Sequence, residues 1–347
     1  MKMRKFFVVI ATVAVFALAV FMIAGCKDSG EAAAGGDEEM GTLYYMATDM
    51  VNGFNIGSAN NAEKFGTELG YEVKVLDAKS SPDTQINQME TAIGLNPKAI
   101  MIKAVDNQTI VESVIKAKEK GIKVFAYDNT ITGTKTDFAS VLGTVKVGEL
   151  AGEECIKMLK EKYGEPKGKI LQVMGDLGDM YSVLIGEGFD NTIGQNPGIE
   201  LITKDSPGWE GQANIVADQL VANDDIDIIF VHADSMIPTV VPVLEERGYG
   251  PGDIMLIGTD GDPSALDKIR EGWIQVSIGV PMIQQVWGMY EFMDEIFAGE
   301  TLKAGTYDIK GVDADLVIED WGPTLYLPGN IITSDNVDDE GLWGNIK

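Results

Sequence analysis

From residue 42 onward, short apolar runs alternate with longer amphipathic stretches, and this alternation constrains the fold more than any other feature. The runs have the length and composition of buried strands, and they cover residues 43–47, 73–76, 99–103 and 124–127. The stretches between them carry apolar residues at helical spacing, over residues 56–69, 82–95 and 110–120. Strands that are apolar on both faces and separated by helices predict a parallel sheet covered by helices.

The same rhythm returns in the second half of the chain. Further strands are predicted over residues 169–173, 200–203, 226–231 and 254–257, and further helices over 178–194, 211–222, 237–246 and 263–271. Roughly 300 residues are more than one hydrophobic core usually organises. The sequence therefore predicts an α/β protein with two similar Rossmann-like lobes, each built on a parallel sheet. A closed eight-stranded barrel has the same alternation, and periodicity alone leaves it open.

The first 26 residues have the organisation of an export signal. Lys2, Arg4 and Lys5 precede an uncharged apolar segment at 6–23, and small residues lead to Cys26. The apolar segment is also near the length that spans a bilayer, so an uncleaved membrane helix is the alternative. Residues 23–26, Ile-Ala-Gly-Cys, resemble the bacterial lipobox, in which the cysteine is lipidated and becomes the new N-terminus. We therefore expect a signal peptide at 1–25 and a lipid-anchored flexible tether at 26–41, whose composition is polar and small.

The charge balance excludes several partners. The chain has a formal net charge of −27, and loss of residues 1–25 removes three basic and no acidic residues. Such a surface repels nucleic acid and anionic lipid headgroups.

The cysteine and histidine content limits the chemistry of the chain. Only Cys155 remains beside Cys26, which favours a buried helix thiol. The single His232 argues against a histidine-rich metal site and histidine acid–base chemistry. We expect neither a metal ion nor a cofactor.

Candidate ligand-binding residues follow the predicted strands, because open parallel sheets bind ligands at the carboxyl ends of their strands. Carboxylates and carboxamides can bond hydroxyl groups, and aromatic rings can stack on the C–H face of a sugar. The candidates are Asn52, Phe54, Asn55, Asp128, Asn129, Tyr181, Trp209, Asp234 and Asp260.

Each candidate also has a structural alternative. Asp or Asn directly after a strand often forms a turn or caps the next helix. The flanking Gly258 and Gly261 favour a ligand-binding role for Asp260. Trp209 follows Pro207 and Gly208 in a polar segment, and this position favours a ligand-binding role for it as well. An exported saccharide hydrolase could use paired carboxylates such as Asp128 and Asp260. No recognisable catalytic motif supports that alternative, so we expect a protein that is not an enzyme.

Several short motifs, in their order and spacing, make the chain resemble the type I periplasmic binding proteins of the ribose/galactose/xylose class, which deliver sugars to ABC importers. The resemblance covers essentially all of residues 42–347 and disfavours the barrel. The motifs are Val51-Asn52-Gly53-Phe54, Leu69-Gly70-Tyr71-Glu72-Val73, Gly121-Ile122-Lys123-Val124 with Tyr127-Asp128, Gly186-Glu187-Gly188-Phe189, Ile257-Gly258-Thr259-Asp260-Gly261 and Thr333-Ser334-Asp335-Asn336-Val337.

The resemblance assigns roles to some candidates. Asn52 and Phe54 match the first loop, where the family touches the ligand and packs an aromatic ring on it. Asp128 matches the carboxylate that grips ring hydroxyls. Trp209 matches the stacking aromatic of the second lobe, and Asp260 matches the family Asp of the last pocket loop.

Other family positions differ here. Asn129 stands where an Arg often follows the carboxylate, a second family Arg is missing near Val183, and Ala233 beside Asp234 replaces a family Asn. Arg can neutralise an anion or fix hydroxyl geometry with its rigid fork. The missing arginines disfavour an acidic ligand and leave room for a sugar alcohol, a modified sugar or a cationic ligand.

The resemblance implies a monomeric solute-binding lipoprotein at the periplasmic or extracellular face of the membrane. It would capture a small polar ligand, foremost a neutral sugar, and pass it to an ABC permease. A ligand sensor for a membrane receptor or kinase, and a binder of a polyol, nucleoside or small amine, are the alternatives. The expected N-terminal lobe comprises 42–143 plus 281–327 and the C-terminal lobe 144–280 plus 328–347. A three-crossing hinge near 142–144, 279–281 and 326–329 would join them.

Overall fold

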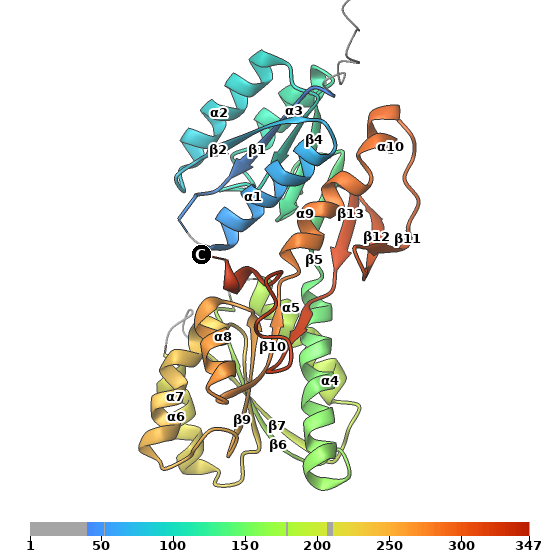
Figure 1. Ribbon diagram of the computed structural model, residues 1–347. Helices are drawn as coiled ribbons and strands as arrows, with labels where there is room; N and C mark the ends of the chain where they lie inside the picture. Colours follow the sequence, from blue (N-terminus) through green and yellow to red (C-terminus); the bar gives the residue numbers. More distant parts are fainter. Residues whose placement is uncertain (1–39, 52, 178–179, 207–210, 347) are drawn as a thin grey trace, which may run out of the picture. The chain divides into compact units, whose positions relative to one another are not determined.

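The computed structural model describes residues 40–51, 53–177, 180–206 and 211–346, all within one compact unit. These residues form two β-sheets with helices packed on them (Figure 1). The prediction of an α/β protein with two sheet-based lobes is therefore confirmed. The predicted strands and helices are present with ends shifted by at most three residues, and residues 178–179 of one predicted helix lie outside the described part.

The first sheet has the strand order β11-β12-β13-β5-β4-β3-β1-β2. Its parallel part is β1 (Thr42–Ala47), β2 (Glu72–Asp77), β3 (Ala99–Ile102), β4 (Lys123–Asp128) and β5 (Phe138–Leu142). β13 (Gly322–Leu327) joins in parallel, and then β12 (Val312–Glu319) and β11 (Gly305–Ile309) add in antiparallel order. The helices are α1 (Gly53–Glu68), α2 (Pro82–Leu95), α3 (Val111–Glu119), α9 (Met282–Glu291) and α10 (Met293–Ala298).

The second sheet has the order β14-β10-β9-β8-β6-β7. Its strands are β6 (Gly168–Met174), β7 (Ile199–Asp205), β8 (Ile228–Val231), β9 (Met255–Asp260), β10 (Ile274–Gly279) and the antiparallel β14 (Asn330–Ile332). Its helices are α4 (Thr144–Tyr163), α5 (Met180–Ile193), α6 (Gln212–Ala222), α7 (Ile237–Glu246) and α8 (Pro263–Arg270), with short 3-10 turns η1 (Asp234–Met236) and η2 (Trp343–Asn345).

The sheets differ from the prediction in two respects. The sequence predicts four strand–helix units per lobe, but each sheet contains a fifth parallel strand, β5 or β10. The sheets are mostly parallel, as predicted, and the sequence analysis did not anticipate that β11, β12 and β14 run antiparallel to a neighbour. A hairpin needs only a tight turn to reverse the chain, and Lys310 and Gly311 supply one with φ angles of 50° and 84°.

The apolar strand runs arise because both faces of each sheet are covered. Side chains alternate across β1, so that Leu43 and Tyr45 enter one core cluster whereas Tyr44 and Met46 enter another. The second sheet likewise separates two clusters. Helices α4 and α5 pack on the second sheet and approach each other closely: a Cβ at Gly148 would lie 2.0 Å from the carbonyl oxygen of Ile185. Glycine is therefore required at this crossing.

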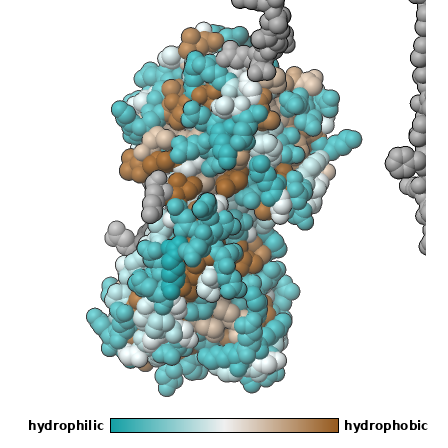
Figure 2. All heavy atoms as spheres, viewed as in Figure 1, coloured by the Kyte–Doolittle hydropathy of each residue, from teal (hydrophilic) through white to brown (hydrophobic). Residues whose placement is uncertain are grey.

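The chain passes between the two sheets three times, after β5, after β10 and after β13. On the face seen in Figure 2, hydrophilic side chains cover most of the surface, in keeping with the net charge of −27. Within the described residues, no helix combines the length and apolar character needed to cross a membrane. The predicted signal peptide, Cys26 and most of the tether lie outside those residues.

Candidate functional site

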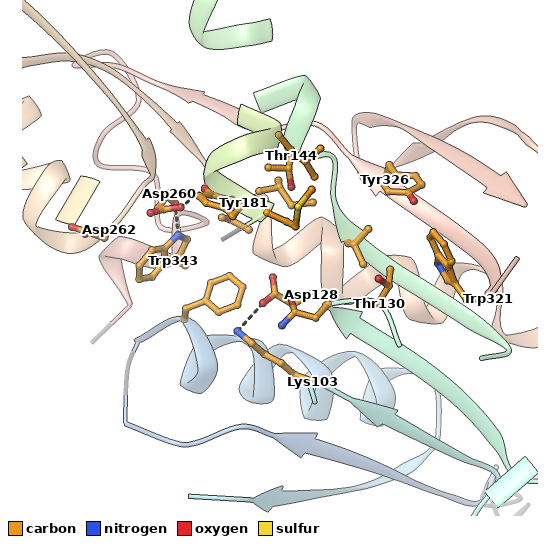
Figure 3. A pocket seen from close by; sticks show the side chains of 17 residues that line it. Lys103, Asp128, Thr130, Thr144, Tyr181, Asp260, Asp262, Trp321, Tyr326 and Trp343 are labelled. Atoms are coloured by element: carbon orange, nitrogen blue, oxygen red, sulfur yellow. Dashed lines mark hydrogen bonds and ion pairs between the residues drawn. The ribbon is translucent and has the colours of Figure 1, made fainter. Parts of the chain in front are cut away.

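A cavity of about 700 Å³ lies at the carboxyl ends of strands from both sheets (Figure 3). Polar residues of the lining come from the ends of β3, β4 and β9 and from the loops that follow them. Apolar and aromatic side chains supply most of the remainder. The lining residues are Phe54, Lys103, Asp128, Asn129, Thr130, Val141, Leu142, Thr144, Met180, Tyr181, Leu184, Asp260, Asp262, Val280, Trp321, Tyr326 and Trp343.

Asp128 and Lys103 form an ion pair on the first-sheet side of the cavity (Figure 3). Lys103 Nζ lies 2.8 Å from Asp128 Oδ2, and the two side chains are only 16% and 22% exposed. The same ammonium donates to Asn55 Oδ1 at 3.2 Å and lies 4.6 Å from the centre of the Phe54 ring. Lys103, which follows β3, thus compensates the carboxylate and links the end of β4 to the first turn of α1.

Asp260 occupies the corresponding position on the second-sheet side. Its Oδ1 accepts a hydrogen bond of 2.5 Å from the Tyr181 hydroxyl, and its backbone carbonyl accepts one of 2.6 Å from Trp343 Nε1. Burial raises the pKa of Asp260 to about 7, Tyr181 opposes the rise, and the nearby charges of Asp262 and Asp128 add to it. The carboxyl group therefore changes between neutral and charged forms near neutral pH.

The two halves of the cavity are built on one plan. The strand orders β5-β4-β3-β1-β2 and β10-β9-β8-β6-β7 correspond strand for strand, so Asp128 at the end of β4 matches Asp260 at the end of β9. Phe54 and Tyr181 likewise occupy the first turns of α1 and α5. Both aspartates have positive φ angles, 66° and 108°, in a region that non-glycine residues rarely adopt. Such backbone strain clusters at ligand sites.

Five predicted residues line the same cavity: Phe54, Asp128, Asn129, Tyr181 and Asp260. The structure does not place Asn55 on it. Asn55 is buried in the first turns of α1, where its amide donates to Thr48 and Asp49. Asn52 and Trp209 lie outside the described residues.

Asp234 also lies away from the cavity, because it is fully buried beneath the loop that carries Asp260. Its Oδ2 accepts hydrogen bonds from the Gly261 amide at 2.7 Å and the Ser277 hydroxyl at 2.6 Å. Burial, with the neighbouring Asp260 charge, raises its pKa well above the usual range. Asp234 shapes the loop and does not face the ligand space.

Two prominent lining residues, Lys103 and Trp343, are not among the residues predicted from the sequence. Lys103 was included only as the last residue of an apolar strand run, and a lone charge in that position was the available signal. Trp343 lies near the C-terminus, far from any predicted strand end, so nothing in the local pattern indicates it. His232 is fully buried, and burial lowers its pKa to about 3.

The chain belongs to the periplasmic binding protein domain family, whose model matches residues 43–301. It is 24% identical over 267 residues to a ribose import binding protein from Salmonella typhimurium, which covers 76% of this chain and 87% of that protein. It is 26% identical over 250 residues to the D-xylose-binding periplasmic protein of Escherichia coli, covering 70% and 74%.

A solved structure shares the fold. The periplasmic ribose ABC transporter structure from Conexibacter woesei aligns with a TM-score of 0.70 at 16% identity, over 86% of this chain and 93% of that one. The two-lobed periplasmic-binding-protein architecture is thereby confirmed, and the closed barrel is excluded by the two separate sheets. The family consists of solute-binding proteins, so the chain is a binding protein and not an enzyme.

Proposed function

We propose that the chain captures a neutral sugar in this cavity and delivers it to an ABC importer. The observation that carries the proposal is the matched pair of carboxylates, Asp128 and Asp260, which face one cavity beside aromatic rings. Carboxylate oxygens accept hydrogen bonds from sugar hydroxyls, while Phe54 offers an apolar face for the C–H groups. The names of the relatives, a ribose import binding protein and a D-xylose-binding protein, support the same class of ligand.

The charge of the cavity favours a neutral ligand over an acidic one. Among the described residues that line the cavity, Lys103 is the only cation, and Asp128 already compensates it at 2.8 Å. Asp260 and Asp262 add further acidic groups. A ligand carboxylate or phosphate would therefore meet net negative charge at short range, which is unfavourable in a partly desolvated site.

Ligand capture would work through relative motion of two lobes, with boundaries at 42–143 plus 281–327 and 144–280 plus 328–347. A ligand that contacts both sets of strand ends favours the closed arrangement by its differential affinity. The monomeric closed form would then be the species that the permease recognises.

A thermal-shift screen of the mature chain tests the proposal. The compounds are neutral sugars, sugar alcohols, nucleosides and small amines, all at the same concentration. We expect one or more sugars to raise the melting temperature, because a ligand that binds only the folded state stabilises it by mass action. A response to nucleosides or amines with none to sugars or sugar alcohols would contradict the sugar proposal.

We further propose that Cys26 carries the lipid anchor after cleavage of residues 1–25. The anchor would hold the binding protein near its permease and raise its local concentration there. When the full chain is expressed in a bacterium, the protein should enter the membrane fraction, and Cys26→Ser should abolish both cleavage and lipid attachment as measured by intact mass. A mature protein that retains residues 1–25 without acyl groups would instead favour the membrane-helix alternative.

A further inference from the structure

The C-terminal segment, residues 333–346, contacts both core regions and the cavity. Val337 and Leu342 are buried in a core cluster of the second sheet. Trp343 and Ile346 pack against the first-sheet cluster that also contacts Phe54. The turn η2 accordingly contacts α1 as well as α8. A terminal segment thus contributes directly to the wall of the candidate ligand site.

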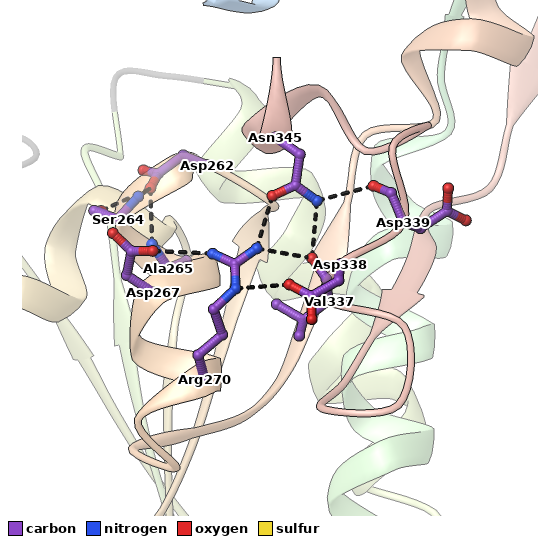
Figure 4. A network of polar contacts seen from close by, with 9 residues as sticks. All are labelled: Asp262, Ser264, Ala265, Asp267, Arg270, Val337, Asp338, Asp339 and Asn345. Carbon is purple, nitrogen blue, oxygen red and sulfur yellow. Dashed lines mark hydrogen bonds and ion pairs between the residues drawn. The ribbon is translucent and has the colours of Figure 1, made fainter. Parts of the chain in front are cut away.

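Arg270, at the end of α8, fixes this segment through several bonds (Figure 4). Its guanidinium contacts Asp338 Oδ1 at 2.9 Å and Asn345 Oδ1 at 2.8 Å, and it donates to the Val337 carbonyl at 3.3 Å. Asn345 then donates from Nδ2 to the carbonyls of Val337 and Asp339, each at 2.8 Å. Exposed ion pairs alone contribute little, but a planar guanidinium with several acceptors fixes geometry.

The segment packs so tightly on the pocket loop that its position is well defined. A Cβ at Gly344 would lie 2.3 Å from the carbonyl oxygen of Gly261 and 2.8 Å from Leu266 Cδ1. Trp343 is therefore held directly beside the loop that contains Asp260. Its indole nitrogen donates to the Asp260 carbonyl at 2.6 Å (Figure 3).

The Trp343 ring meets the Phe54 ring edge-on, with centroids 5.6 Å apart and an interplanar angle of 88°. Both rings line the cavity. Perpendicular aromatic surfaces of this kind form a corner that suits the C–H face of a compact polyhydroxylated ring. The indole also supports the Asp260 backbone at its strained φ of 108°.

We propose that Trp343 is a ligand-contacting residue that helps determine specificity, and that Arg270 is a positioning residue that acts through Asn345 and Trp343. This inference rests on the proposed function of the cavity, since the ligand is taken to be a sugar or sugar alcohol. Arg270 itself is not among the lining residues. A substitution there should therefore alter binding only through the C-terminal segment.

A double-mutant cycle tests both roles. The ligand is whichever of D-ribose, D-xylose, xylitol and myo-inositol binds the unaltered mature chain most tightly, with Kd measured by isothermal titration. Trp343→Ala should raise Kd about tenfold, in line with the loss of an aromatic contact. Arg270→Ala should raise Kd about threefold alone, yet add nothing in the Trp343→Ala background, because residues that act as a unit are not additive.

Two matched controls accompany the cycle. Lys268→Ala removes a cation from the same helix turn, where it pairs with Glu271. Trp287→Phe alters a tryptophan outside the cavity, packed on Phe65 and below Lys310. Both controls should leave Kd within about twofold, the range expected of substitutions that share no partner with the site.

Kd values for Trp343→Ala within twofold of the unaltered chain would overturn the ligand contact, and independent effects of the two substitutions would overturn the positioning role. If none of the four compounds binds the unaltered chain, the cycle is run with any other compound that the thermal-shift screen identifies.

In the unliganded protein, Arg270→Ala should also speed hydrogen exchange at the Asn345 and Ile346 amides, which donate hydrogen bonds to the Leu342 and Trp343 carbonyls. Unchanged exchange would contradict the positioning role even if no ligand were found.

Discussion

Replacement of Asp128 by Asn should lower the free energy of unfolding by about 2 kcal/mol, because it leaves the Lys103 ammonium without its carboxylate partner in a poorly solvated site. The pair is short, at 2.8 Å, and both side chains are mostly buried. Asn tolerates a positive φ better than Ala does, so this substitution isolates the charge from the backbone strain at φ 66°. Urea unfolding at neutral pH measures the change.

The second substitution Lys103→Met provides the control for this result. In the Asp128→Asn chain it should restore most of the lost stability, because no uncompensated ammonium remains, while sugar affinity stays low. Equal stability of the Asp128→Asn and unaltered chains would contradict the ion pair. Restored affinity in the double variant would contradict the role of Asp128 as a hydroxyl acceptor.

In the unliganded protein, replacement of Asp260 by Asn should change the free energy of unfolding in a pH-dependent way. The change should be more stabilising at pH 8 than at pH 4 by on the order of 3 kcal/mol. The pKa of Asp260 is raised to about 7 in the folded state, mainly by burial, whereas an unfolded Asp titrates near 4. Below both pKa values the Asp260 carboxyl group is neutral in the folded and the unfolded state, so it does not change the free energy of unfolding. As the pH rises from 4 to 7, the unfolded chain releases this proton first, so the folded state loses stability.

The Asn variant lacks this loss, so the difference in unfolding free energy between the two chains should grow in its favour across that pH window. Asp262→Asn is the comparison variant: it keeps the cap of α8 on the Ser264 and Ala265 amides, since Asn caps helices equally well, and should show only a small part of this pH dependence, because the Asp262 charge raises the pKa of Asp260 less than burial does. A constant difference between pH 4 and pH 8 for the Asp260 variant would contradict the raised pKa.

The parallel part of the fold was predictable because its physical signal is local. Strands β1, β3 and β4 are buried on both faces, which produces a continuous apolar run between amphipathic helices. The β11–β12 hairpin has a different signal. Residues of β12 alternate between buried Ala314 and Leu316 and exposed neighbours, and Lys310-Gly311 marks the turn. Continuous apolar runs therefore do not indicate the β11–β12 hairpin.

The site was predictable in part for a related reason. Asp128 and Asp260 directly end apolar strands, so the rule that ligands bind at carboxyl ends of parallel strands selects both. The same rule cannot separate Asp260 from Asp234, since both follow strands and only the packing shows that Asp234 is buried. Trp343 reaches the cavity through the fold of the C-terminal segment, a tertiary relation with no local pattern.

The most direct test of the central claim is isothermal titration of the mature chain and its Asp128→Asn/Asp260→Asn variant with the sugar that gives the largest thermal shift. We expect saturable binding of one sugar molecule by the unaltered chain and a strong loss of affinity in the double variant. Circular dichroism and the melting temperature would establish that the variant is folded. Equal affinity of the two chains would contradict the assignment of this cavity as the sugar site.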